Sequence, residues 1–134
     1  MKRIKSIIFS VLVLLGVGMS SQTIYASSQS VYAHYRVHAS GNGISSGKTN
    51  NVWHYLNKNR RVTLRISSST GAGSGLCTLK RKGIILDKNF GQVSSNVGTH
   101  HFGLKTDKTS GQYFLEFYGG NANNTHTIHG TIHD

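Results

Sequence analysis

Glu116 is the only glutamate in the chain, and it lies within the apolar run YFLEFY of residues 113–118. If this run forms a strand, side chains alternate between its faces and Glu116 shares one face with two aromatic rings. Desolvation raises the pKa of such a carboxyl group, whereas a cationic partner lowers it. A carboxylate, a histidine and an arginine can act as base, acid and phosphate clamp in RNA cleavage, as in small secreted ribonucleases. The candidate catalytic set is Glu116, His100 and Arg65.

The rest of the sequence argues against this ribonuclease. No ribonuclease motif surrounds Glu116, and no stretch after residue 26 shows the apolar spacing of three and four residues that is typical of a helix. An ion pair between Glu116 and an arginine on a neighbouring strand is a simpler explanation of the buried acid. We therefore predict that the protein is not an enzyme, and we keep a secreted nuclease as the alternative.

The chain has eight histidines, but their spacing does not indicate a metal site. None has the two-histidine helical spacing of a zinc enzyme. In a strand, His129 and His133 share a face but lie about 13 Å apart, which is too far for one ion. We predict exposed histidines without a metal or other cofactor. Imidazoles gain charge as the pH falls from 7 toward 5, so binding of anions should tighten in acid.

Basic residues are concentrated in one part of the sequence. Between residues 58 and 88 the only acid is Asp87, and eight basic residues lie there: Lys58, Arg60, Arg61, Arg65, Lys80, Arg81, Lys82 and Lys88. If the strands at 62–67 and 76–80 lie near one another, these charges form a single positive surface. Such a surface attracts polyanions and accelerates their encounter with the protein. A merely solubilising surface would contain more acids.

Residues 1–26 have the pattern of a secretory signal peptide. Lys2, Arg3 and Lys5 precede the mostly apolar residues 7–17, and Ala26 suits a cleavage site. As a helix the apolar stretch would span only about half of a bilayer core, so we expect cleavage and no retained transmembrane segment. No lipid-attachment cysteine follows it, and the proline needed for a wall-sorting motif is missing. We expect an extracellular product of a Gram-positive bacterium, with residues 27–134 as the secreted domain.

After residue 26 the sequence has a period of two, which is typical of half-buried strands. Strands are expected at 31–38, 52–56, 62–67, 76–80, 83–87, 100–104, 112–118 and 125–133, with turns at 39–51, 67–75, 87–91 and 107–111. Cys77 alternates with Leu79 and should be a small buried side chain. Seven or eight short strands predict an all-β, jelly-roll-like antiparallel β-sandwich, with a small barrel as the alternative.

These observations together predict a binding protein. Removing Lys2, Arg3 and Lys5 lowers the formal net charge from +11 to +8, which is still strongly cationic. The polyanions that an exported protein meets are teichoic acids, anionic lipid headgroups, acidic glycans and released nucleic acid. We expect a secreted, cationic, non-enzymatic protein that binds anionic cell-envelope components and acts as a bacteriocin-like antibacterial factor. The lack of an amphipathic helix argues against a membrane-lytic mechanism.

Overall fold

The computed structural model describes residues 27–37, 45–46, 52–71, 74–121 and 123–134. The predicted signal peptide, His38 and most of the predicted turn at 39–51 lie outside the described residues. The described part of the chain contains strands and no helix. Accordingly, it has no helix long and apolar enough to cross a membrane. The predicted all-β class is confirmed.

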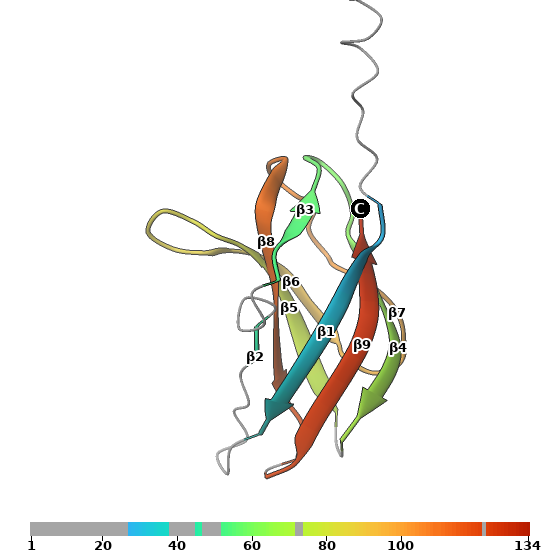
Figure 1. The fold of residues 1–134 in the computed structure, drawn as a ribbon. Coiled ribbons are helices and arrows are strands. Elements are labelled where there is room, and N and C mark those ends of the chain that lie inside the picture. The colour runs from blue at the N-terminus through green and yellow to red at the C-terminus, as the bar shows by residue number, and fades with distance from the viewer. Residues whose placement is uncertain (1–26, 38–44, 47–51, 72–73, 122) are drawn as a thin grey trace, which may run out of the picture.

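The strands form two antiparallel sheets (Figure 1). The four-stranded sheet has the order β1-β9-β4-β7, and its strands are β1 (Gln29–Arg36), β9 (Thr125–His133), β4 (Thr63–Thr70) and β7 (Gly98–His101). The five-stranded sheet has the order β2-β8-β5-β6, with β3 also paired to β8. Its strands are β2 (Ser45–Ser46), β3 (His54–Leu56), β5 (Gly75–Arg81), β6 (Lys88–Ser94) and β8 (Ser110–Gly119). Buried side chains of both sheets form one core, so the predicted sandwich is confirmed.

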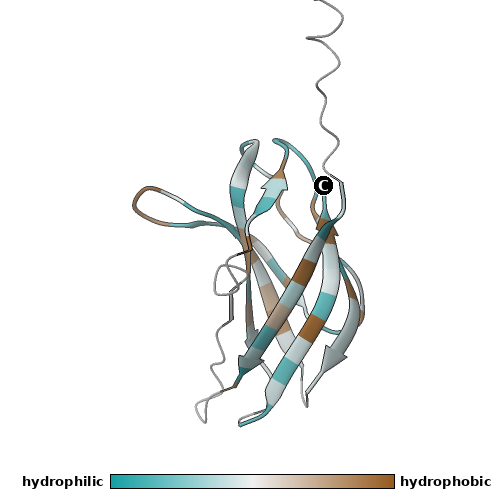
Figure 2. Ribbon diagram, viewed as in Figure 1, coloured by the Kyte–Doolittle hydropathy of each residue, from teal (hydrophilic) through white to brown (hydrophobic). Residues whose placement is uncertain are grey.

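The alternation of apolar and polar residues explains which side chains fill this core. Figure 2 shows brown apolar bands separated by paler or teal polar positions along β1 and β9. The alternate residues predicted to face inward are buried: Val31, Ala33, Tyr35, Val37, Val62, Leu64, Ile66, Ile128 and Ile132. In the run 113–118, for which the sequence did not indicate the buried face, Tyr113, Leu115 and Phe117 are buried in the core. Cys77 is also fully buried, as predicted, and burial raises the pKa of its thiol. The protein is therefore held together by its hydrophobic core.

The strand β9 has the predicted bounds and lies in the middle of its sheet, between β1 and β4. Its Gly130 pairs with Val31 on one side and with Ile66 on the other, next to an irregularity in the register of β4. A Cβ atom at this position would lie 2.2 Å from the carbonyl oxygen of Arg65. Only glycine therefore allows β4 to approach β9 this closely.

Two predicted elements between β5 and β6 are wrong. The predicted strand at 83–87 is an extended loop, and the predicted turn at 87–91 lies mostly in the strand β6. Ile84, Ile85 and Leu86 are exposed and have no strand neighbour to bury them. The strand predicted at 100–104 also ends earlier, at His101, although the next residue, Phe102, is fully buried.

Candidate anion-binding site

Two loops that are far apart in the sequence are joined by hydrogen bonds at one end of the sandwich. They are the β3–β4 loop, residues 57–62, and the β7–β8 loop, residues 102–109. The backbone N–H of Asn59 donates to the carbonyl oxygen of Thr106 at 2.8 Å, and the Thr106 N–H donates to that of Arg60 at 3.0 Å. The N–H of Lys58 donates to Oγ1 of Thr109 at 2.9 Å. These bonds hold Lys58, Arg60 and Arg61 beside the β7–β8 loop.

The β5–β6 hairpin is tied to the same β7–β8 loop through Asp107. Arg81 donates from Nε to Oδ1 of Asp107 at 2.9 Å and from Nη2 to Oδ2 at 2.8 Å. Nζ of Lys88 lies 3.1 Å from Oδ2 of the same carboxylate. The hydrogen bond from Arg81 is the main reason that the pKa of Asp107 is well below its usual range. Asp107 is therefore ionised and joins the basic β5–β6 hairpin to the β7–β8 loop.

We call this assembly the basic end. It consists of the cations Lys58, Arg60, Arg61, Arg81, Lys82, Lys88, Lys105 and Lys108. Its acidic side chains are Asp87, Asp107 and Asp134, the last of which accepts a hydrogen bond from the backbone N–H of Asn57. Positive side chains therefore outnumber negative ones by five. The sequence did not indicate Lys105 and Lys108, because only the hydrogen bonding between the loops brings them to the other cations.

Ion pairing divides the basic end into two groups. Arg81 and Lys88 pair with Asp107, and Lys82 lies 3.6 Å from Asp87. No carboxylate in the described part of the chain forms an ion pair with the five remaining cations, which are all exposed: Lys58, Arg60, Arg61, Lys105 and Lys108. These five are therefore available to an anionic ligand, whereas Arg81 and Lys88 are partly neutralised.

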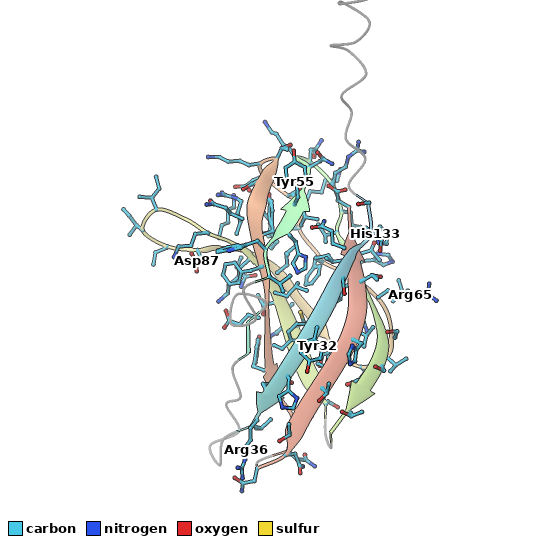
Figure 3. The ribbon with its side chains drawn as sticks, in the orientation of Figure 1. Tyr32, Arg36, Tyr55, Arg65, Asp87 and His133 are labelled. Carbon is cyan, nitrogen blue, oxygen red and sulfur yellow. The ribbon has the colours of Figure 1, made fainter. Side chains whose placement is uncertain are left out.

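The structure does not bring all eight predicted binding residues together. Arg65 lies on β4, which belongs to the four-stranded sheet, whereas Lys80 and Arg81 lie on β5 of the other sheet. Figure 3 shows Arg65 on the opposite side of the molecule from Asp87, which lies in the β5–β6 hairpin. Lys80 is directed to the outer face of its sheet, where it pairs with Glu116. The basic end therefore contains six of the predicted residues and lacks Arg65 and Lys80.

An open groove runs between the β5–β6 hairpin and the beginning of β8, with a volume of about 770 Å³. Its cations are Arg81, Lys82 and Lys108, and its uncharged donors include Thr109 and Gln112. Residues 84–86 of the hairpin supply an aliphatic wall. Guanidinium, ammonium and hydroxyl groups together form strong hydrogen bonds with phosphate or carboxylate oxygens. The groove can therefore hold an anionic group beside an apolar one.

Glu116 lies outside the basic end, on the outer face of the five-stranded sheet. Its Oε2 is 2.7 Å from Nζ of Lys80, so the partner is a lysine on the neighbouring strand and the predicted arginine is wrong. His100 and Arg65, the other members of the catalytic alternative, lie on β7 and β4 of the other sheet. Nε2 of His100 is hydrogen-bonded to the carbonyl oxygen of Asn96 at 2.7 Å. The structure thus distributes the three residues over both sheets.

Two histidines are buried, contrary to the prediction that histidines are exposed. His54 and His126 are almost completely inaccessible, and Nδ1 of His54 and Nε2 of His126 have no hydrogen-bond partner. Burial lowers the pKa of His54 to about 4. The ring of His126 stacks on that of Tyr35, with centroids 5.2 Å apart. Within the described ranges, no three His, Cys, Asp or Glu side chains form a group that could hold a metal ion.

We compared the chain with protein-family models, with curated proteins and with solved structures, and none of them matched. No family's activity or ligand is therefore transferred to this chain. Its function is inferred from the contacts and charges of the described residues.

Proposed function

We propose that this protein binds anionic polymers of bacterial cell envelopes through its basic end, without catalysing a reaction. The observation that supports the proposal is the gathering of five unpaired, exposed cations on two hydrogen-bonded loops. Such a local excess of one charge attracts a polyanion and raises the rate of its encounter with the protein. The candidate ligands are teichoic acids, anionic lipid headgroups, acidic glycans and released nucleic acid.

The arrangement of the loops favours binding of a chain of phosphates over binding of one isolated anion. Arg60 and Arg61 offer planar guanidinium groups that bind phosphate oxygens through two parallel hydrogen bonds. Lys105 and Lys108 lie on the adjoining loop and extend the positive surface. The backbone hydrogen bonds between the loops fix the positions of these residues before the ligand arrives, which lowers the entropic cost of binding.

The biological role that we propose is antibacterial. A cationic protein released from one cell binds the phosphate-rich envelope of a competing cell, in the manner of a bacteriocin. Export is an inference from residues 1–26 of the sequence. Binding through a folded positive surface requires no amphipathic helix, in agreement with the strands of the described domain.

The test compares two double variants that lose the same charge at different places. Arg60→Gln with Arg61→Gln removes two exposed arginines of the basic end, and Arg36→Gln with Arg65→Gln removes two exposed arginines elsewhere. Affinity for purified poly(glycerol phosphate) teichoic acid is measured by titration calorimetry at low and at moderate salt. We expect the first variant to lose about tenfold or more in affinity and the second no more than about twofold.

Both variants should keep the thermal stability of the original protein, because exposed charges contribute little to it. Equal losses in the two variants would show that net charge alone governs binding, and would overturn the assignment to the basic end. Unchanged affinity in both would exclude a role for these cations. The same titration with single-stranded RNA separates a general preference for polyphosphates from a preference for teichoic acid.

A further inference from the structure

The β5–β6 hairpin ends in three consecutive aliphatic residues that are almost fully accessible. Ile84 has an exposed fraction of 105%, Ile85 of 91% and Leu86 of 83%. We call residues 84–86 the aliphatic tip. The hairpin projects away from both sheets in Figure 1, and its end is coloured apolar in Figure 2. Adjacent large aliphatic side chains exposed in this way mark a surface that binds a protein or a membrane.

The hairpin has a defined turn below the aliphatic tip. A Cβ atom at Gly83 would lie 1.8 Å from the carbonyl oxygen of Leu86, so the turn requires glycine. The backbone N–H of Gly83 donates to Oδ1 of Asp87 at 3.2 Å. At the base of the hairpin, the N–H of Lys82 donates to the carbonyl oxygen of Gln112 on β8 at 3.0 Å. These contacts hold the tip away from the core of the protein.

Positive charges surround the base of the hairpin. Arg81 and Lys82 precede the aliphatic tip and Lys88 follows it, and Lys108 lies across the groove. Two acids offset part of this charge: Asp107 pairs with Arg81 and Lys88, and Asp87 lies 3.6 Å from Lys82. Lys82 and Lys88 each lie two residues from the aliphatic tip, and the contact of Gly83 with Leu86 closes the turn between them, so basic and apolar side chains are close together. Apolar side chains of interfacial proteins enter the bilayer by about 5–10 Å, with basic side chains at the level of the lipid phosphates. The short spacing lets the tip enter the bilayer while the basic side chains remain at the level of the lipid phosphates.

A membrane fits these observations better than a second copy of the chain does. A second copy that received the tip in a hollow would have to line that hollow with apolar side chains. The hollow on the four-stranded sheet is lined by Arg65, Ser67, Gly130 and Thr131, and it has no large aliphatic side chain. An anionic bilayer supplies an apolar interior for the tip and phosphates for the cations that flank it.

We propose that the aliphatic tip inserts into the interface of an anionic lipid bilayer while the basic end binds the lipid phosphates. The proposal rests on the proposed function for the role of the cations; it selects the anionic lipid from the candidate ligands and adds insertion into the bilayer. Insertion of a single hairpin tip positions the protein on a membrane without a membrane-spanning segment. The acyl region of the lipid then replaces the water around residues 84–86, and the groove beside the tip lies at the headgroup level.

The first experiment measures binding to vesicles. Ile84→Ser with Ile85→Ser is compared with Leu76→Ser with Val97→Ser, which removes two exposed aliphatic residues elsewhere. Cosedimentation uses vesicles of phosphatidylcholine alone and of phosphatidylcholine with phosphatidylglycerol. We expect the tip variant to bind the anionic vesicles at least about tenfold more weakly, and the control no more than about twofold. Retention of the tip variant on teichoic acid should be unchanged.

The second experiment measures insertion directly. Ile85→Cys is labelled with an environment-sensitive fluorophore, which does not react with the fully buried Cys77. Anionic vesicles should shift the emission to shorter wavelength, and brominated lipids should quench it. A label that stays in water, or a tip variant that binds anionic vesicles normally, would overturn the insertion proposal.

The two proposals fail in different ways. Tip-dependent binding to anionic vesicles, combined with no binding to teichoic acid by the original protein, would support insertion and overturn the proposed binding of envelope polymers. Normal binding to teichoic acid with no effect of the tip would overturn insertion alone. Tip-dependent self-association in sedimentation equilibrium without vesicle binding would assign the tip to a second copy of the chain, and would also overturn the lipid proposal.

Discussion

The two most apolar runs of the domain have opposite environments. In β8, Tyr113, Leu115 and Phe117 are fully buried, whereas Ile84, Ile85 and Leu86 in the β5–β6 hairpin are exposed to water. The strand β8 pairs with β5 along one edge and with β2 and β3 along the other, so both of its edges are covered. The hairpin tip has no neighbouring strand. Strand pairing, and not local hydropathy, therefore determines which of the two runs enters the core.

The contrast also separates two uses of apolar surface. Burial of the β8 run within the sandwich stabilises the folded domain. Exposure of the aliphatic tip contributes nothing to folding and leaves that free energy available for binding. A change in the first run should thus affect stability, and a change in the second should affect only an interaction.

The largest expected effect is the difference in stability between two leucine-to-alanine variants, one in each apolar run. Leu115→Ala creates a cavity in the core and should lower the free energy of unfolding by roughly 2–5 kcal/mol. Leu86→Ala should change it by less than about 0.5 kcal/mol, because the side chain is exposed. Urea denaturation followed by tryptophan fluorescence measures both values. A similar loss in the two variants would show that the tip packs against the domain in solution.

The pattern of alternation was sufficient to predict most of this fold. Buried and exposed residues alternate in β1 as predicted, and the run 125–133 forms β9 with the predicted bounds. The prediction of a strand at 83–87 was wrong because isoleucines favour strands only where a neighbour buries them. The contact of Gly83 with Leu86, which makes the turn, depends on the three-dimensional structure and has no signal in the sequence.

The candidate site was predicted in part, for a similar reason. The cations at 58–61 and 81–88 are close in the sequence and do meet at one end of the molecule. Arg65 does not join them, because β4 belongs to the four-stranded sheet. Lys105 and Lys108 do, because hydrogen bonds hold their loop beside Lys58 and Arg60. Pairing between distant segments decides both outcomes, and a single sequence contains no record of it.

Acid should lower the free energy of unfolding through a buried histidine beside β8. His54 lies opposite Tyr113 of β8, and burial lowers the pKa of its imidazole to about 4 from an ordinary value of 6.5. Above pH 6.5 the imidazole is neutral in both the folded and the unfolded chain and its titration does not change stability, but the unfolded chain binds a proton between pH 6.5 and 4. The free energy of unfolding should therefore fall over this range, by about 3 kcal/mol at most.

Urea midpoints at pH 7 and 4.5 measure this loss, and His54→Leu should reduce it by removing the titrating group. Asp107 acts in a different range. The pKa of this carboxyl is depressed, so its contribution is present above its ordinary value of 3.8 and is lost as the pH falls further. A His54→Leu variant with the same pH dependence as the original protein would assign the loss to another group.

The smallest expected effect concerns Glu116, the one charged residue within the buried run. Its carboxylate and Nζ of Lys80 are 2.7 Å apart, and both side chains are about a quarter exposed, at 25% and 27%. Solvent weakens such a pair, so Glu116→Gln should lower the free energy of unfolding by no more than about 1 kcal/mol. Lys80→Met removes the other partner and serves as the matched control.

Incubation of both variants and of the original protein with labelled RNA tests the nuclease alternative. We expect no cleavage by any of the three, because Glu116 lies on a different sheet from His100 and Arg65. The opposite result would be RNA cleavage by the original protein and by the Lys80→Met variant, with no cleavage by the Glu116→Gln variant. That result would identify Glu116 as a catalytic residue.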